Sequence, residues 1–411
     1  MEVLRRIGRC LIPRAPSPPR VLKEGEFTVL DPAVKLEEEN MPAFDQHAYY
    51  PVRFGEVFNE RYQVLSKLGY GTNSTVWFCR DLLEHQYSAV KVYTHNTNSQ
   101  REVKVLEQIA STKSQHPGKA KIRNALDSFE IDGPRGRHQC LVQEPLLMNF
   151  QQLQYSFKHR TISEDMLKIL LRELFVALDY LHTEAHVVHT DIQSGNIMLV
   201  SLDSSIFDEW DTLEQEEPSP RKIIEGHTIY KSRTFQRQDD YRSVGPPLLS
   251  DFGEARAGCR EYSGLIQPNQ YRAPEVVLGM KWTSKVDIWN VGAMISSVLE
   301  NNFLFKGTGP DGEHSDAHLL AEMISVIGPP PIKFLEKSEK SWQYWTTDGD
   351  WRSLAPIPPR PIGLSEAQNR NQELFVQFLW KMLAWVPEER YCAKELLQDE
   401  WLNSKPMSVR Q

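Results

Sequence analysis

The chain has 411 residues, of which 40% are hydrophobic and 25% are charged, and its formal net charge is −8. This composition is that of a globular protein with enough length for two domains, and it excludes a fibrous or largely disordered chain. The negative charge argues against nucleic-acid binding through bulk charge and would suit a basic peptide as a partner.

The cysteines and the apolar runs give no sign of a secreted or membrane protein. Five cysteines are scattered without CxxC pairs, so we expect neither a disulfide framework nor a zinc site. A reducing compartment, cytoplasmic or nuclear, is the simplest expectation. No apolar run approaches the roughly 18 residues needed to cross a bilayer, so we predict no membrane-spanning segment.

The first 45 residues are rich in arginine and proline and end in an acidic run. The arginines are Arg5, Arg6, Arg9, Arg14 and Arg20, and the acidic run is Glu37–Glu39. An arginine-rich start is typical of a mitochondrial targeting peptide, but Pro13 and Pro16 would interrupt the amphipathic helix that such a peptide needs. We therefore predict a disordered tail over residues 1–45, with a targeting peptide as the alternative.

A small sheet is predicted from Tyr62 onward. The segments 62–68, 75–80 and 87–93 have the alternation and the β-forming residues of strands. The glycines in Gly69–Ser74, between the first two segments, would let the backbone approach phosphate oxygens. The flanking strands make this segment a β-hairpin, whereas a dinucleotide-binding fingerprint would open a helix.

Lys91 lies within the third strand, where its ammonium group needs a partner. A helix predicted over about 99–110 offers Glu102. The position of Lys91, one strand after the glycine hairpin, favours a lysine held by Glu102 that contacts the α and β phosphates of a nucleotide. A surface lysine at the edge of the sheet is the alternative.

Two further strands, 126–131 and 138–144, complete the predicted sheet. The residues just past them, Glu144–Leu146, are the expected hinge to a second domain, and their backbone could hydrogen-bond an adenine. Pro145 has no N–H, so the donor would come from a neighbour such as Leu146.

The chain then becomes helical and delivers a short polar loop. Thr161–Glu164 has the pattern of a capping box, and the leucines that follow at helical spacing are expected in the core. In the loop His189–Asn196, Asp191 follows the histidine by two residues and Asn196 follows Asp191 by five. This spacing is typical of a phosphoryl-transfer loop, in which the aspartate accepts the proton of the attacking hydroxyl and the asparagine binds a metal ion. A plain turn is the alternative.

The segment 201–247 is polar and lacks periodicity, so we predict an insertion that is disordered or a loop. Order returns at Asp251-Phe252-Gly253. A carboxylate at the end of a strand, followed by a flexible glycine, suits a Mg²⁺ ligand that chelates phosphates.

Two carboxylates further on are expected to be structural. Glu275, in Ala273-Pro274-Glu275, is predicted to pair with Arg390 rather than to be an independent surface charge. Residues 284–299 are apolar nearly all round, which predicts a helix buried on every side. Asp287, at its start, is expected to accept the backbone N–H groups of the loop at Asp191, which is compatible with a plain helix N-terminal role.

In this order the motifs resemble the eukaryotic protein kinase family over about residues 55–405. Finer features are similar to the SR-protein-specific kinases of the CMGC group, especially their fungal members. These features are Tyr50–Arg53 leading into Arg61–Val64, Thr190 after His189, the insertion before Asp251, and Ala317–Ile324. The resemblance implies an α+β, bilobal kinase fold with a small β-rich N-lobe (55–146) and a larger, mainly helical C-lobe (147–405).

The resemblance also implies a function and its residues. It implies a monomeric Ser/Thr kinase that uses ATP and Mg²⁺ and phosphorylates serines of Arg/Ser-rich proteins, with no nucleic-acid or membrane partner. It makes Asp191 the catalytic base, aided by Lys91, Glu102 and Asn196, and makes Asn196 and Asp251 the metal ligands. The nucleotide-binding residues that it implies are Leu68, Gly69, Gly71, Val76, Ala89, Lys91, Glu144 and Leu146.

Two residues depart from the family pattern. Thr190 replaces the arginine that in many kinases pairs with a phosphorylated activation loop, so we expect activity without that phosphorylation. Gln193 replaces a lysine that steadies the γ-phosphate, and losing such a cation can cost orders of magnitude in rate. Gln193 is therefore the main support for a second hypothesis, a pseudokinase scaffold that binds nucleotide or partners without transfer.

A small-molecule phosphotransferase resembling the aminoglycoside kinases is a third hypothesis. The segments Ala273–Glu275 and Asp287–Trp289 speak against it, because they build a peptide-binding shelf. For a basic peptide substrate, the candidate docking surface is the acidic loop at Asp311, Glu313 and Asp316.

Overall fold

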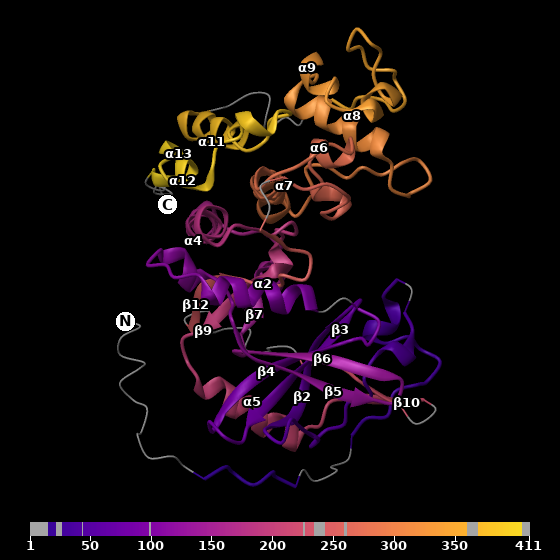
Figure 1. The fold of residues 1–411 in the computed structure, drawn as a ribbon, viewed down its shortest axis with the longest axis vertical. Helices are drawn as coiled ribbons and strands as arrows, with labels where there is room; N and C mark the ends of the chain where they lie inside the picture. The colour runs from indigo at the N-terminus through magenta and orange to yellow at the C-terminus, as the bar shows by residue number, and fades with distance from the viewer. Residues whose placement is uncertain are drawn as a thin grey trace. The chain divides into compact units, whose positions relative to one another are not determined.

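The computed structural model describes residues 15–21, 27–42, 44–97, 100–224, 227–233, 243–258, 261–359 and 369–404. The chain divides into two compact units (Figure 1). Unit 1 consists of Met1–Gln100, Asn124–Leu146 and Ser201–Arg237. Unit 2 consists of Arg101–Arg123, Leu147–Val200 and Gln238–Gln411.

Unit 1 is built on a six-stranded antiparallel sheet with the strand order β1-β2-β3-β4-β6-β5. Its strands are β1 (Val57–Phe58), β2 (Tyr62–Gly71), β3 (Ser74–Asp81), β4 (Gln86–Tyr93), β5 (Ala125–Gly133) and β6 (Gly136–Gln143). The five predicted strands are confirmed. Their alternating apolar residues, such as Val64, Trp77, Val90 and Val142, form one buried cluster.

The insertion is a folded part of unit 1. It contains α5 (Ser205–Glu216), which packs against β2, and a hairpin of β10 (Arg221–Ile224) and β11 (His227–Tyr230) (Figure 1). Trp210 stacks on Phe78 with ring centroids 5.7 Å apart, and Tyr230 stacks on Phe54 at 4.0 Å. The prediction of a loop or disorder is therefore wrong for these elements. Single large aromatic side chains anchor them, and such anchors leave no periodic pattern in the sequence.

The acidic run Glu37–Glu39 is also folded into unit 1. It forms most of a 3-10 helix, η1 (Glu37–Asn40), and a second one, η2 (Gln46–Ala48), follows. Lys67 of β2 is fully buried, and its Nζ lies 2.9 Å from the carboxylate of Glu37 and 2.5 Å from that of Glu38. Lys222 of β10 pairs with Glu39 at 2.5 Å. Because a buried ammonium group needs a charge partner, these contacts order the segment, and the prediction of a disordered tail is wrong for it. Residues 1–14 and 22–26 lie outside the described residues.

Unit 2 is mainly helical. Its elements are α2 (Gln100–Ser111), η3 (Pro117–Lys121), β7 (Met148–Asn149), α3 (Phe150–Ser156), α4 (Glu164–Tyr180), the π-helical turn η4 (Leu181–Ala185), β8 (Val187–Val188), η5 (Ser194–Asn196), β9 (Ile197–Ser201), β12 (Val244–Leu249), β13 (Arg256–Ala257), η7 (Asn269–Tyr271), α6 (Pro274–Val277), α7 (Lys285–Glu300), α8 (Asp316–Ile327), α9 (Ile332–Leu335), η8 (Glu339–Gln343), α11 (Arg370–Trp380), η9 (Pro387–Glu389), α12 (Ala393–Leu396) and α13 (Glu400–Asn403).

Helices α4 and α7 form the centre of unit 2 and pack against each other. The leucine stripe of α4 is buried as predicted, and α7 is buried on nearly every side. The N-cap of α4 is Ser163, whose hydroxyl accepts the N–H of Met166 at 3.3 Å, so the predicted capping box at Thr161 is wrong. The helix begins later than predicted, which places Glu164 in the first turn, where the helix dipole favours a carboxylate.

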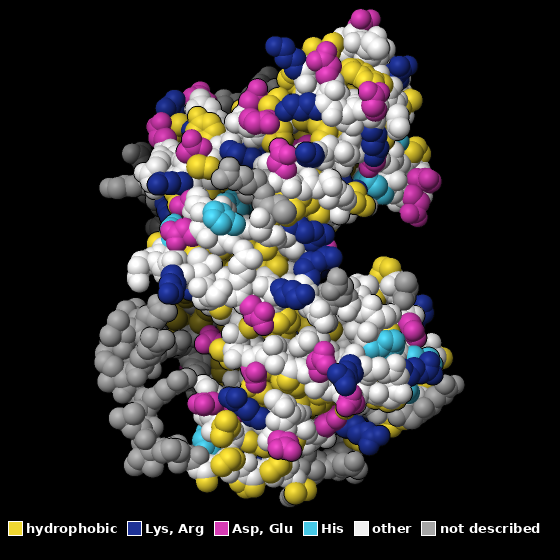
Figure 2. Space-filling model, in the orientation of Figure 1, with side chains coloured by type: hydrophobic (Ala, Val, Ile, Leu, Met, Phe, Trp, Pro, Cys, Tyr) yellow, Lys and Arg dark blue, Asp and Glu magenta, His cyan; other side chains and the backbone are white. Residues whose placement is uncertain are grey.

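Acidic and basic side chains are interspersed over the visible face (Figure 2). Within the described ranges, no helix has both the length and the hydropathy of a membrane span.

Candidate functional site

Asp191 is the centre of a hydrogen-bonded loop between β8 and β9. The Nε2 of Gln193 donates to both of its carboxylate oxygens, at 2.8 and 3.0 Å. The Nδ2 of Asn196 donates to Oδ2 at 2.7 Å and to the backbone oxygen of Asp191 at 2.9 Å. The predicted pair Asp191 and Asn196 therefore meets in the structure, and both side chains are held in fixed orientations.

Burial raises the pKa of Asp191 above its usual value. The carboxylate of Asp251 raises it further, because two negative charges close together are unfavourable. The charge of His189 and the amide donors of Gln193 and Asn196 oppose this rise without cancelling it. A carboxyl group whose proton affinity is raised in this way is suited to act as a general base.

Asp287 holds the backbone of this loop, as predicted. Its buried carboxylate accepts the N–H of His189 at 2.9 Å and that of Thr190 at 2.7 Å. Asn290, one turn further along α7, accepts the N–H of Ile192 through Oδ1 at 3.3 Å. We did not predict Asn290 as part of the site. Its signal was a second polar residue in a helix that is otherwise apolar.

Asp251 is brought beside Asn196 by the pairing of β12 with β9. Both the N–H and the hydroxyl of Ser250 donate to the backbone oxygen of Asn196, at 2.9 and 3.0 Å. The ring of His189 packs on Phe252, with centroids 4.9 Å apart. Asp251 has a left-handed backbone conformation, with a φ of 62°. Residues other than glycine rarely adopt this conformation, and those that do are concentrated at functional sites.

The donor set at Asn196 and Asp251 fits Mg²⁺. The amide nitrogen of Asn196 faces Asp191, which leaves its carbonyl oxygen as the ligand atom, and carboxylate and carbonyl oxygens are the ligands that Mg²⁺ prefers. Among the described residues, no three His, Cys, Asp or Glu side chains cluster tightly enough to hold a metal alone.

Helix α2 is tied to the segment that follows Asp251. Glu102 is buried, and its Oε1 accepts the N–H of Phe252 at 3.3 Å. Arg101 pairs with the carboxylate of Glu254 at 3.1 Å, and the hydroxyl of Thr190 donates to the backbone oxygen of Glu254 at 2.7 Å. The Thr190 hydroxyl thus links the two loops at the position of the missing arginine.

In unit 1, the predicted nucleotide residues share a row across the sheet. Gly69 pairs with Val76, and Val76 pairs with Lys91. Directly paired residues point to one face of a sheet, and Ala89, two residues before Lys91, shares that face. The Nζ of Lys91 lies 5.1 Å from the ring centroid of Tyr93.

The glycines of the hairpin are not required by the folding of unit 1. A Cβ added at Gly69 would meet no atom within 4 Å, and one at Gly71 would meet only the hydroxyl of Ser74, at 3.9 Å. Neither glycine has a positive φ. Since neither conformation nor packing calls for glycine here, close approach of a ligand is the reason that fits.

The remaining predicted contacts of the nucleotide stay predictions. Leu68 is partly buried, Leu146 is buried and Glu144 is exposed, and all three belong to unit 1. The pairing of Lys91 with Glu102 would join the two units, so it also stays a prediction.

Glu275 and Arg390 form the predicted ion pair. Both carboxylate oxygens of Glu275 accept guanidinium N–H groups of Arg390 at 2.7 Å, and the side chains are 1% and 0% exposed. Of the acidic loop, Asp311 and Glu313 are exposed, whereas Asp316 pairs with Lys340 at 3.1 Å.

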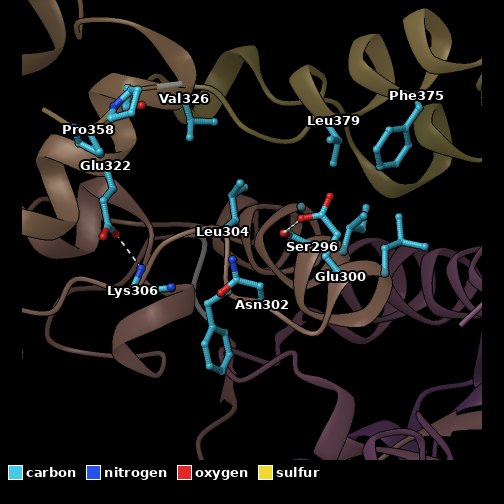
Figure 3. Close-up of a pocket in the computed structure, with 16 residues that line it drawn as sticks. Ser296, Glu300, Asn302, Leu304, Lys306, Glu322, Val326, Pro358, Phe375 and Leu379 are labelled. Atoms are coloured by element: carbon cyan, nitrogen blue, oxygen red, sulfur yellow. Dashed lines mark hydrogen bonds between the residues drawn. The ribbon is translucent and has the colours of Figure 1, made fainter. Parts of the chain in front are cut away.

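Unit 2 also contains a cavity of about 380 Å³ (Figure 3). Apolar side chains such as Leu304, Val326 and Leu379 line it, together with Glu300 and Glu322. The carboxylate of Glu322 accepts two backbone N–H groups of the loop beside it, at 2.6 and 2.9 Å. The cavity contains none of the predicted site residues.

Comparison with known proteins gives the family. The model of the protein kinase domain matches residues 62–402. A serine/threonine protein kinase of Aspergillus fumigatus is 54% identical, covering 95% of this chain and 96% of that protein. A serine/threonine-protein kinase SRPK of Physarum polycephalum is 27% identical, covering 90% and 92%. SRSF protein kinase 3 of Mus musculus is 23% identical, covering 92% and 94%.

The crystal structure of the PF14_0431 kinase domain has the same fold, with a TM-score of 0.64 and 24% identity over 87% of this chain and 100% of that one. The family match leaves the small-molecule phosphotransferase hypothesis without support. The chain therefore belongs to the protein kinase family, as a serine/threonine kinase with the predicted α+β fold.

Proposed function

We propose that this kinase transfers the γ-phosphate of ATP to serines of Arg/Ser-rich proteins. The observation that carries the proposal is the arrangement at Asp191, whose carboxylate is fixed by the side-chain amides of Gln193 and Asn196. The hydroxyl of Ser250, the residue before Asp251, binds the backbone oxygen of Asn196. In the reaction, the serine oxygen bonds to the γ-phosphorus, the bond from that phosphorus to the bridging oxygen breaks, and ADP leaves. Asp191 takes the proton of the serine hydroxyl.

The other residues bind the nucleotide and its metal. Asn196 and Asp251 would hold Mg²⁺, which when bound neutralises charge on the phosphates. The hairpin with Gly69 and Gly71 and the ammonium group of Lys91 would contact the phosphates. Apolar residues of unit 1 that include Val76 would enclose the adenine.

The substrate class rests on two supports. The relatives from Physarum polycephalum and Mus musculus carry the names SRPK and SRSF protein kinase. The exposed carboxylates of Asp311 and Glu313 offer negative charge to an arginine-rich peptide, whereas Asp316 is engaged by Lys340.

The decisive experiment is radiolabelled phosphate transfer to an Arg/Ser peptide and to an Ala/Ser peptide of equal length. We expect labelling of the first peptide only, and its loss in Asp191→Asn without loss of ATP binding. If the wild-type protein binds ATP but labels no peptide, it is a pseudokinase scaffold. If both peptides are labelled equally, the Arg/Ser specificity is wrong.

Docking is tested by reversing two charges. The variant with Asp311→Lys and Glu313→Lys should raise the KM for the Arg/Ser peptide and leave the KM for ATP unchanged. Asp348→Lys with Asp350→Lys, a second exposed acidic pair, is the matched control. Equal effects on both KM values, or equal effects of both variants, would discard the docking surface.

A further inference from the structure

The carboxamide nitrogen of Gln193 contacts both oxygens of one carboxylate. A carboxamide nitrogen carries two hydrogens. Both of the contacts found for this nitrogen go to Asp191, one to Oδ1 at 2.8 Å and one to Oδ2 at 3.0 Å. One N–H that points between the two oxygens accounts for both contacts, and the group brings no positive charge.

The backbone of the loop explains why this contact forms. Gln193 is extended, with φ −154° and ψ 160°, and it directly precedes the single turn η5, where its carbonyl accepts the N–H of Asn196 at 2.9 Å. The turn brings the amides of both residues to the same carboxylate. Asp287 and Asn290 bind the backbone N–H groups of the residues before and after Asp191. The backbone of Asp191 is therefore fixed as well as its carboxylate.

The contact of Gln193 differs in charge from the one that a lysine would make. A lysine at this position would bring a positive charge that can meet both the aspartate and a phosphate. The amide of Gln193 is neutral, so it brings no positive charge to a phosphate oxygen, and its contacts go to Asp191.

We propose that Gln193 is a positioning residue, which acts by orienting the carboxylate of Asp191 toward the acceptor hydroxyl and not by bringing charge to the γ-phosphate. This inference rests on the proposed kinase reaction. It also names the reacting atom. Oδ2 accepts from both Gln193 and Asn196, whereas Oδ1 accepts from Gln193 only, so Oδ1 is the oxygen that takes the proton.

The test compares kcat with the two KM values in three variants. Gln193→Ala frees the carboxylate, so kcat should fall about 10- to 100-fold, as expected for a misaligned base, while the KM for ATP changes less than about twofold. Gln193→Glu keeps the shape but cannot donate and adds a like charge, so its kcat should fall at least as far. Gln193→Lys restores a donor, so it should retain a larger part of kcat than either.

Gln151→Ala is the matched control. Its carbonyl oxygen lies about 4.0 Å from where a Cβ on Gly195 would be, so it shares the neighbourhood, but its amide contacts Tyr155 and not Asp191. This variant should keep both kcat and KM. Equal melting temperatures for all variants would show that the losses are not caused by unfolding.

Three results would overturn the inference. If Gln193→Ala raises the KM for ATP at unchanged kcat, the amide binds a phosphate. If Gln193→Glu matches the wild type, its donors are idle, and if Gln151→Ala loses as much as Gln193→Ala, the effect belongs to the loop as a whole. If the wild-type protein transfers no phosphate, the proposed function itself is refuted. In that case Asp191→Asn would also change nothing, which distinguishes this outcome from the three above.

Discussion

The buried ion pair of Glu275 and Arg390 gives the sharpest prediction of stability. Arg390 donates two bonds of 2.7 Å to Glu275, and it also donates to the backbone oxygens of Ala384 at 2.9 Å and Lys285 at 3.1 Å. Its guanidinium lies 4.9 Å from the ring centroid of Trp289. Removing the arginine would leave a carboxylate that is only 1% exposed without its counter-charge.

For Arg390→Met we expect a loss of about 3–5 kcal/mol in the free energy of unfolding, the range for breaking a buried pair from one side. The two bonds to Glu275 alone give a similar figure, because each hydrogen bond to a charged group is worth about 1.5–3 kcal/mol. The double variant Glu275→Leu with Arg390→Met removes both charges. It should therefore be more stable than the single variant, although the two backbone oxygens still lose their donor.

Guanidinium unfolding followed by tryptophan fluorescence and by circular dichroism measures these differences. The two probes also show whether the units unfold together, which a single free energy requires. Lys281→Met is the control, because its pair with Glu261 is exposed on both sides and such pairs contribute about 0–1 kcal/mol. A loss below about 1 kcal/mol for Arg390→Met, or a double variant less stable than the single one, would refute the reasoning.

Three further predictions concern regulation and unit 1. Thr190→Val keeps the shape of the side chain but loses the hydrogen bond to the backbone oxygen of Glu254, so kcat should fall about 2- to 10-fold. Phosphatase treatment should leave wild-type activity unchanged, and a loss of activity on treatment would contradict the expected independence from phosphorylation. Lys67→Met leaves two glutamates of η1 without their buried partner, so the free energy of unfolding of unit 1 should fall by about 3–5 kcal/mol. The measurement is hydrogen exchange in β2, which should become faster, and unchanged exchange there would rule this out. Tyr49→Phe removes the hydroxyl that donates to the backbone oxygens of residues 71 and 72, at 2.9 and 2.8 Å. The glycine hairpin should then become more mobile, and the KM for ATP should rise about 2- to 5-fold. A lower kcat at constant KM would contradict this role.

Local patterns carried most of the fold and much of the site. Strand alternation placed β2, β3 and β4, and an all-round apolar helix predicted the buried α7. The spacing of Asp191 and Asn196 survives in the structure because both sit in one short loop. The pairing of Glu275 with Arg390 was predictable because each charge lies in a recognisable motif.

Long-range contacts were harder to predict. Nothing near Lys67 in the sequence indicates that its partners are two glutamates about thirty residues earlier, and nothing in residues 201–233 indicates that Trp210 and Tyr230 pack on the sheet of unit 1. The contact between Gln193 and Asp191 is local, yet it depends on a side-chain direction that residue order does not specify.

By itself, the sequence determined the kinase elements and the residue types of the catalytic loop, because spacing within short segments fixes which groups can meet. The tertiary structure alone decided where the acidic run and the insertion are buried and what Gln193 binds. Burial of charge and the direction of a hydrogen bond depend on neighbours that the folded chain brings together. In the linear sequence these neighbours are either far apart or, where they are near, their side-chain directions are not specified.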